Sequence, residues 1–332
     1  MNMSARDVII IGAGPSGLSA AIAAKRRDLD YQVLEQGVLV NSIYHFPPQM
    51  VFFTTPELLE IGGLPFVSPY DKPTRPEALK YYRKVVDTFD LQVSYGEKVV
   101  SVECEPGGSG GEHVFAIDTQ SASGVRRSRR ARHVVMAIGY YDHPVMIGVP
   151  GEDLPHVRHY YGEPHPHYRQ RVVIVGGGNS AAESALEMFR AGAHVTIVHR
   201  ASALKSTIKY WVRPDIENRI KEGSIAARFG TCVTEIRAAS ILLAGPHGND
   251  ELPAEAVYLL TGYRADAELL RHAGVLLNER DAPVHDPETF ETNVSGLFVA
   301  GGAIAGVDTG TIFIENGRFH GEKIIEVIAR RG

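Results

Sequence analysis

The stretch Val8-Ile-Ile-Ile-Gly12-Ala-Gly14-Pro15-Ser16-Gly17 decides the fold of this chain. An apolar run typical of a buried strand leads directly into a glycine-rich turn, and a helix pattern follows. The first glycine permits a tight strand-to-helix turn, the second lets backbone approach a pyrophosphate, and the third lets the helix pack closely on the strand. The stretch therefore predicts a βαβ unit that holds a dinucleotide at the N-terminus of its helix.

A second copy of this pattern, Gly176-Gly-Gly178-Asn179-Ser180-Ala181, directly follows the apolar run 172–175. One glycine-rich turn is weak evidence, because such turns are common, but both copies lie between a strand pattern and a helix pattern. Two copies in one chain of this length imply two nucleotides bound at once. That combination indicates a flavoprotein supplied by a nicotinamide cofactor.

The residue that ends the second strand of each unit distinguishes the two nucleotides. Glu35 lies 23 residues after Gly12, where a carboxylate accepts hydrogen bonds from both hydroxyls of an unphosphorylated adenosine ribose. His199 occupies the matching place after Gly176, and Arg200 follows it. Because a guanidinium binds a 2′-phosphate that a carboxylate would repel, we expect FAD at the first site and NADPH at the second. The alternative is that His199 and Arg200 only finish a solvent-exposed strand.

Length and composition agree with two soluble domains. The chain has 332 residues, of which 44% are hydrophobic, and this suffices for two cores. A net charge of −5 gives no sign of a nucleic-acid or membrane-surface role. The first residues lack the apolar segment of a secretory signal, and two cysteines make no disulfide framework, so we expect a cytoplasmic protein.

The order of patterns along the chain predicts an α/β fold of two Rossmann-like, three-layer domains. A helix is expected over 75–89, strands between 91 and 135 with a glycine-rich turn at 106–111, and a strand running into Gly139. A strand at 296–300 and a helix near 311–331 should return to the first domain. The expected FAD domain is therefore 1–142 with 266–332, the NADPH domain 155–262, and the linkers 143–154 and 263–265.

The chain resembles the bacillithiol disulfide reductase family of thioredoxin-reductase-like flavoproteins along nearly its whole length. The residues that carry this resemblance are Ser42-Ile-Tyr-His-Phe-Pro, Phe52-Phe-Thr, Pro65-Phe, Lys72-Pro, Ala78-Leu-Lys-Tyr-Tyr-Arg, Ala137-Ile-Gly-Tyr-Tyr, Gly176-Gly-Gly-Asn-Ser-Ala and Thr311-Ile-Phe-Ile-Glu-Asn-Gly-Arg-Phe-His-Gly. The resemblance implies a dimeric FAD-containing NADPH oxidoreductase. Its acceptor would be a low-molecular-weight disulfide or a protein electron carrier.

The resemblance also implies which further residues contact the cofactors. For FAD these are Pro15, Ser16, Gln36, Ser42, Tyr44, Val99, Gly139 and Gly301, with the backbone of Thr311, Ile312 and Phe313 at the start of the last helix. For NADPH they are Gly178, Asn179, Ser180, Ala181, Lys205 and Gly262. No metal site and no catalytic acid or base is predicted, because the cofactors carry the chemistry.

Three departures from the family pattern affect the expected mechanism. Members commonly have cysteine where this chain has Ser16, and the Cys-x-x-Cys pair that thioredoxin reductases carry in the NADPH domain is absent from this sequence. Cys104 and Cys232 lie in strand-like runs, where single cysteines are most often small buried hydrophobes, so a dithiol relay looks absent. Gly302 stands where thioredoxin reductases usually have aspartate, and Asp308 is our candidate for the missing ribityl contact.

Several features admit two interpretations. The histidine-rich stretch 156–167 is either a structured linker, which we favour, or a metal site. The arginine run 126–132 is either a solvated hairpin or a docking surface for an acidic electron-transfer protein. Phe52 and Phe53 either pack near the flavin or belong to the core. Alternative functions are a ferredoxin- or flavodoxin-type NADP reductase, a flavin monooxygenase and a flavin redox sensor that does not turn over.

Overall fold

The computed structural model describes residues 5–105, 113–246 and 248–331. The expected glycine-rich turn at 106–111 lies outside the described residues. The chain forms two compact units: unit 1 consists of Met1–His143 and Tyr263–Gly332, and unit 2 of Pro144–Gly262. Residues 144–154 thus belong to unit 2 and residues 263–265 to unit 1. Each unit is described by itself.

Unit 1 is built on a seven-stranded sheet that divides at one long strand. Its strands are β1 (Arg6–Ile11), β2 (Tyr31–Leu34), β3 (Val93–Ser94), β4 (Glu97–Glu105), β5 (Val114–Ser121), β6 (Arg126–Met136) and β15 (Leu297–Val299). The second half of β6 pairs in parallel with β1 and β15, which gives the parallel order β3-β2-β1-β6-β15. The first half pairs antiparallel with β5, and β5 pairs with β4.

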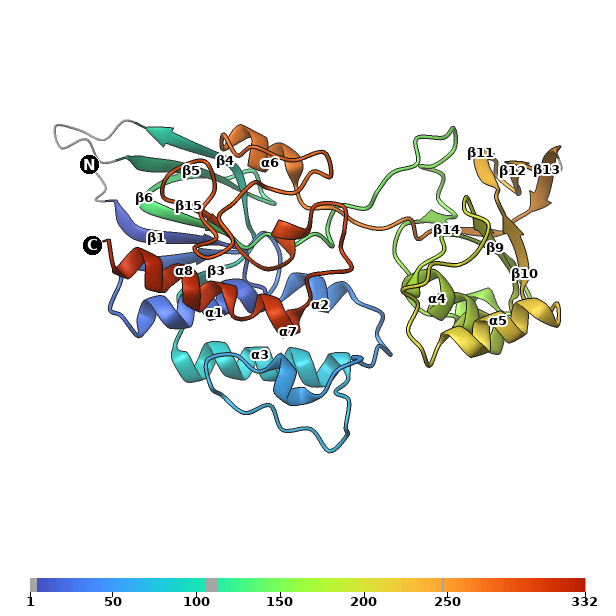
Figure 1. Ribbon diagram of the computed structural model, residues 1–332, viewed down its shortest axis with the longest axis horizontal. Coiled ribbons are helices and arrows are strands. Elements are labelled where there is room, and N and C mark those ends of the chain that lie inside the picture. The colour runs from blue at the N-terminus through green and yellow to red at the C-terminus, as the bar shows by residue number, and fades with distance from the viewer. Residues whose placement is uncertain (1–4, 106–112, 247, 332) are drawn as a thin grey trace. The chain divides into compact units, whose positions relative to one another are not determined.

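Side chains of β1 alternate between two cores, as a strand with both faces covered requires. Val8 and Ile10 face the helical layer, and Ile9 and Ile11 face the β4–β5 side. Figure 1 shows α1 and α8 side by side on one face, with α6 packed against β4 on the other. The helices of unit 1 are α1 (Pro15–Lys25), α2 (Asn41–His45), α3 (Arg75–Phe89), α6 (Ala267–His272), α7 (Ile314–Gly317) and α8 (His320–Ala329), with 3₁₀ turns η1 (Pro56–Leu59) and η3 (Gly301–Ala305).

The predicted helix over 75–89 is confirmed as α3. Thr74 and Glu77 form a capping box, and Pro76 sits in the first turn, where its missing N–H costs nothing. The single helix expected near 311–331 is wrong, because the chain forms two helices, α7 and α8. Asn316 and Gly317 have weak helix propensity, and the Asn316 side chain instead closes its own turn by accepting the N–H of Phe313 and donating to Thr311.

Unit 2 repeats the layered pattern on a smaller scale. Its parallel sheet has the order β10-β9-β8-β14-β7, and a three-stranded antiparallel sheet, β11-β12-β13, covers one face. Val172 and Ile174 face the α4 side, whereas Val173 and Val175 face the three-stranded sheet. The elements are β7 (Val157–Arg158), η2 (His165–His167), β8 (Arg171–Val175), α4 (Asn179–Arg190), β9 (His194–His199), α5 (Arg213–Lys221), β10 (Ala226–Phe229), β11 (Cys232–Ile236), β12 (Ser240–Gly245), β13 (Gly248–Pro253) and β14 (Ala256–Leu259).

His320, the first residue of α8, links that helix to the turn after β15. Its Nδ1 accepts the backbone N–H of Gly301 at 3.1 Å, and its ring stacks on Phe290 at 4.3 Å. Burial, together with the nearby Lys323 and His285, lowers the pKa of His320 to about 4. The imidazole is therefore neutral near pH 7, as an acceptor at Nδ1 must be.

This arrangement predicts a pH-dependent loss of stability in unit 1. The unfolded chain binds a proton at His320 near pH 6.5, whereas the folded one resists it to about pH 4, so stability falls as pH drops through that window. We expect about 2–3 kcal/mol to be lost, measured by urea unfolding followed through flavin fluorescence. His320→Asn, which keeps an acceptor but does not titrate, should remove most of the drop. The exposed His272→Asn should not, and an unchanged pH profile in His320→Asn would refute the assignment.

Candidate cofactor sites

A cavity opens in unit 1 at the C-terminal ends of its parallel strands, the place where open α/β sheets bind ligands. Ile11 and Leu34 end β1 and β2, Ala137 follows β6, and Ala300 follows β15, and all four line it. The cavity holds about 1200 Å³ of free space, including its open mouth. That is ample room for a large cofactor.

Most of the residues predicted to contact FAD line this one cavity. They are Gly12, Gly14, Pro15, Ser16, Glu35, Gln36, Ser42, Val99, Gly139, Gly301, Ile312 and Phe313. Gly17 lies beneath the turn, where a Cβ would come within 2.0 Å of the carbonyl oxygen of Gly12. Tyr44, Asp308 and Thr311 do not line the cavity.

The geometry of the first glycine turn fits a pyrophosphate. Gly12 has φ +105°, and a Cβ there would lie 2.3 Å from the carbonyl oxygen of Ala137. Gly14 is different, because a Cβ at that position would meet no atom within 4 Å. The backbone at Gly14 therefore faces open space at the start of α1, which is the approach a diphosphate needs.

Glu35 is buried at the end of β2 and is held in a fixed orientation. Its two carboxylate oxygens accept the backbone N–H groups of Ala13 and Gly37, each at 2.8 Å. Burial raises the pKa of Glu35 more than these hydrogen bonds lower it, and the neighbouring Asp142 raises it further. Asp142 also lines the cavity and accepts hydrogen bonds from Gln36 and Asn41. No local sequence pattern indicated Asp142, because its contacts are with Gln36 and Asn41, 106 and 101 positions away.

Tyr44, predicted to contact FAD, does not line the cavity. Its ring is 48% exposed, and the guanidinium of Arg75 lies over it at 5.5 Å. Arg75 also donates to the carbonyls of Ile43 and Tyr44, so it anchors the C-terminal end of α2. Phe46, two residues on, lines the cavity instead and packs edge-on against Tyr141.

Two C-terminal residues predicted to contact FAD, Asp308 and Thr311, do not line the cavity. Asp308 is exposed, lies outside the cavity wall and pairs with Arg280 at 3.4 Å. Phe313 lines the cavity, but its backbone N–H already donates to the Asn316 side chain at 2.9 Å. Thr311 is exposed, and its hydroxyl donates to the Asp308 carbonyl.

No cysteine lines the cavity among the described residues. Ser16 stands at the fingerprint position, and its hydroxyl donates to the carbonyl of Gly317 at 2.9 Å. The expectation that Cys104 and Cys232 are buried is wrong, because both are exposed. They lie near the ends of β4 and β11, where strand side chains that face away from a core meet solvent. The two cysteines also belong to different units.

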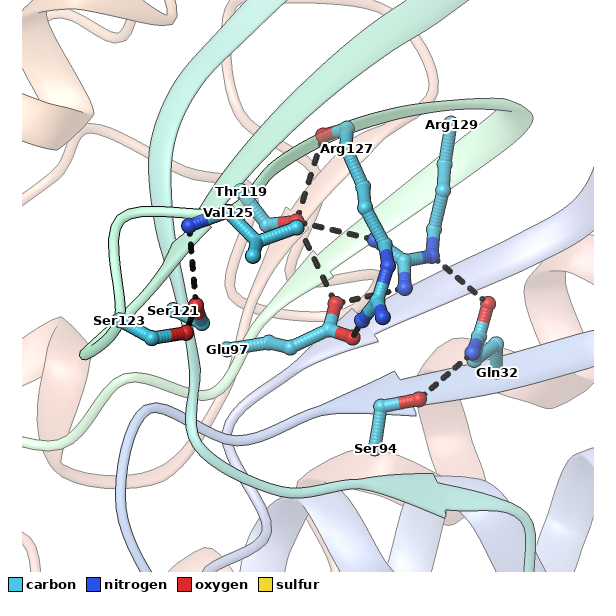
Figure 2. A network of polar contacts seen from close by, with 9 residues as sticks. All are labelled: Gln32, Ser94, Glu97, Thr119, Ser121, Ser123, Val125, Arg127 and Arg129. Carbon is cyan, nitrogen blue, oxygen red and sulfur yellow. Dashed lines mark hydrogen bonds and ion pairs between the residues drawn. The ribbon is translucent and has the colours of Figure 1, made fainter.

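Arginine ion pairs connect neighbouring strands of the sheet close to Val99, a residue that lines the cavity. Figure 2 shows the buried Glu97 between Arg127 and Arg129, with Arg129 continuing through Gln32 to Ser94. The Arg129–Glu97 ion pair is 2.6 Å long.

The network accounts for most of the arginine run at 126–132. Arg130 and Arg132 pair with Glu105 and Asp7. Four of the five arginines in this run are thus neutralised within the sheet, which favours the hairpin interpretation over an acidic docking partner.

The second glycine turn joins β8 to α4 in unit 2. Ala181 packs beneath Gly176, because a Cβ added at Gly176 would lie 3.2 Å from the Cβ of Ala181. Ser180 is exposed in the first turn of α4. The Asn179 side chain donates to the Thr207 carbonyl and accepts the N–H of Lys209. These two hydrogen bonds hold the segment after β9 against the glycine turn. Gly262 follows β14 and has open space at its Cβ position.

Three basic residues gather at the end of β9. The ring of His199 is buried over Gly177, where a Cβ would come within 2.4 Å of it. Burial lowers the pKa of His199, and the nearby Lys205 and Arg200 lower it further. The imidazole is therefore a neutral packing group, while the exposed Arg200 and Lys205 form no ion pair with any described residue.

The histidine-rich stretch contains β7, the turn η2 and extended chain. His167 is buried and bonds to Tyr258 and Gln170, and His159 lies 3.7 Å from Glu152. Within residues 5–105, 113–246 and 248–331, no three histidine, cysteine or acidic side chains are grouped as metal ligands would be. The same part of the chain has no helix that is both long and apolar enough to cross a membrane.

Two dinucleotide turns, one beside a buried carboxylate and one beside free cations, define a flavoprotein oxidoreductase that takes its electrons from a nicotinamide. Comparison with known proteins supports this class of enzyme. A family model described as pyridine nucleotide-disulphide oxidoreductase matches residues 9–301. The bacilliredoxin reductase Bdr of Bacillus subtilis (strain 168) is 40% identical over 333 residues, which cover 99% of each chain.

Two solved structures are similar over the full length. Bacillithiol disulfide reductase Bdr (YpdA) from Bacillus cereus has a TM-score of 0.95 at 38% identity, covering 99% of this chain and 100% of that one. The protein of the same name from Staphylococcus aureus has a TM-score of 0.91 at 37% identity, covering 99% of each chain. The chain belongs with them, in the bacillithiol disulfide reductase branch of the pyridine nucleotide-disulphide oxidoreductases. It is an NADPH-dependent flavoprotein oxidoreductase that uses FAD.

Proposed function

We propose that this enzyme reduces bacillithiol disulfide with NADPH, and that no thiol of its own takes part. The full-length similarity to Bdr carries the choice of acceptor. The reaction consumes one NADPH and one proton and yields NADP⁺ and two thiols. When bound, FAD supplies the redox chemistry by accepting hydride from NADPH and passing two electrons onward.

The arrangement of hydroxyl and thiol groups supports a mechanism without a protein disulfide. A dithiol relay needs one thiolate beside the flavin and a second thiol to resolve the mixed disulfide. Ser16 offers a hydroxyl at the cavity, and that hydroxyl is already bonded to Gly317. Neither Cys104 nor Cys232 lines the cavity, so neither thiol stands beside the proposed flavin site.

The cavity residues support a position in unit 1 for two parts of FAD. The turn from Gly12 to Gly17 would hold the pyrophosphate, and Glu35 would accept the ribose hydroxyls of the adenosine. In unit 2, the turn from Gly176 to Ala181 would hold the NADPH pyrophosphate. Arg200 and Lys205 would bind its 2′-phosphate, since both are exposed cations at the end of β9. A homodimer in the cytoplasm, as the family resemblance and the low cysteine content suggest, completes the proposal.

Arg200→Ala should therefore lower kcat/KM for NADPH by roughly one to two orders of magnitude and leave NADH nearly unchanged. One charge-assisted hydrogen bond contributes about 1.5–3 kcal/mol, and only the phosphorylated cofactor offers this partner. Steady-state kinetics with both cofactors measure the effect. Arg237→Ala, an exposed cation in the three-stranded part of unit 2, serves as control. Equal losses with NADPH and NADH would mean that Arg200 is structural.

The acceptor is tested by following NADPH consumption with bacillithiol disulfide, glutathione disulfide, a bacilliredoxin–bacillithiol mixed disulfide and ferredoxin. We expect turnover with bacillithiol disulfide to exceed turnover with the other acceptors. The Cys104→Ala/Cys232→Ala double variant should keep the wild-type rate, because neither thiol lies at the cavity. Loss of turnover in that variant, with flavin reduction by NADPH intact, would restore a thiol mechanism. A preference for ferredoxin would replace the proposed acceptor.

A further inference from the structure

The ring of Tyr140 lies across Gly302 in the wall of the unit 1 cavity. A Cβ at Gly302 would come within 2.7 Å and 2.9 Å of the Cδ1 and Cε1 atoms of Tyr140. Gly302 is absent from the glycines with positive φ, so its backbone would accept any residue. The tyrosine ring, rather than the backbone conformation, therefore requires glycine at position 302. Tyr140 occupies the space that a side chain from 302 would use.

Most polar side chains that line this cavity already have partners within the protein. The paired groups are Ser16 with Gly317, Glu35 with Ala13 and Gly37, Gln36 and Asn41 with Asp142, Glu97 with two arginines, and His143 with Asp266. Among the described lining residues, Ser42, Lys98 and Tyr140 are the polar side chains with no such bond. Of these three, Tyr140 is the one that meets the Cβ position of Gly302. A half-buried hydroxyl without a protein partner costs free energy unless a ligand or water satisfies it.

The surroundings of Tyr140 keep its hydroxyl protonated. Burial raises the pKa of Tyr140, and the carboxyl group of Glu315 on α7 raises it further, because a second negative charge nearby disfavours the phenolate. Glu315 is itself partly buried and bonded to Thr54. The Tyr140 hydroxyl is thus a hydrogen-bond donor at neutral pH.

The position of Tyr140 identifies the part of FAD that it would contact. Gly301 packs directly on Ser16, since a Cβ there would lie 2.3 Å from the Ser16 hydroxyl, so this wall adjoins the turn that would hold the pyrophosphate. Glu35, at the end of β2, marks the adenosine side of that turn. The segment of FAD that continues from the pyrophosphate away from adenosine is the ribityl chain, which carries several hydroxyl groups.

We propose that Tyr140 is a cofactor-binding residue whose hydroxyl donates a hydrogen bond to the ribityl chain of FAD, in the space that Gly302 leaves free. Asp308, which sequence reasoning placed in this role, lies outside the cavity and pairs with Arg280. The proposal rests on FAD binding and not on the acceptor, so it stands or falls separately from the reduction of bacillithiol disulfide.

The first test is Tyr140→Phe, which keeps the ring over Gly302 and removes only the donor. We expect FAD to bind about three- to ten-fold more weakly, as the loss of one hydrogen bond implies. The affinity is measured from flavin release when the holoprotein is diluted. Tyr82→Phe is the matched control, because it removes a hydroxyl that donates to Leu59 in the core of unit 1. Equal FAD affinity in Tyr140→Phe and the unchanged protein would overturn the proposal.

The second test exchanges the two side chains. Tyr140→Ala should weaken FAD binding more than Tyr140→Phe does, and Gly302→Asp alone should also weaken it because the new side chain meets the tyrosine ring. In the Tyr140→Ala/Gly302→Asp double variant the aspartate has room and can accept bonds from ribityl hydroxyls. We expect it to recover affinity relative to Tyr140→Ala, with circular dichroism showing that every variant is folded. A double variant that binds FAD no better than Tyr140→Ala would contradict the shared space.

Discussion

The close packing of three backbone segments around Ser16 is the constraint on which unit 1 depends. The turn after β1, the turn after β15 and the junction of α7 with α8 all meet there. A Cβ at Gly301 would come within 2.3 Å of the Ser16 hydroxyl, and one at Gly317 would come within 3.1 Å of the Gly301 Cα. The Ser16 hydroxyl donates to the Gly317 carbonyl, so this side chain both fills the space between the segments and joins two of them by a hydrogen bond.

This packing determines what the cavity can do. Gly321 continues the same contact, since a Cβ there would meet the backbone of Ala20, so α8 is pressed directly onto α1. His320 then accepts the Gly301 N–H and fixes the turn that leads into Gly302. The position of the backbone beside the cavity is therefore determined by close glycine contacts and by hydrogen bonds between uncharged groups. A thiol at position 16 would sit at this junction, and this chain has a hydroxyl in its place.

The sequence predicted the parts of the structure that depend on local pattern. Both glycine turns, α3 with its capping box, and the strand ends at Glu35 and His199 follow from short-range spacing and composition. The contacts that sequence reasoning missed join residues far apart in the chain. Tyr140 against Gly302, Asp142 beside Glu35, and Asn316 closing the turn at Phe313 each depend on how separate segments pack. The burial expected for the cysteines failed for a similar reason, because a strand pattern does not say which face meets solvent.

A mechanism without a protein thiol makes FAD the only redox-active group of the protein, since Ser16 replaces a thiol and neither Cys104 nor Cys232 lines the cavity. An anaerobic titration of the holoprotein with dithionite, followed by flavin absorbance and by thiol counting, measures this directly. We expect full reduction to take two electrons for each FAD and to create no new thiols. Uptake of four electrons for each FAD, with two thiols appearing, would contradict it.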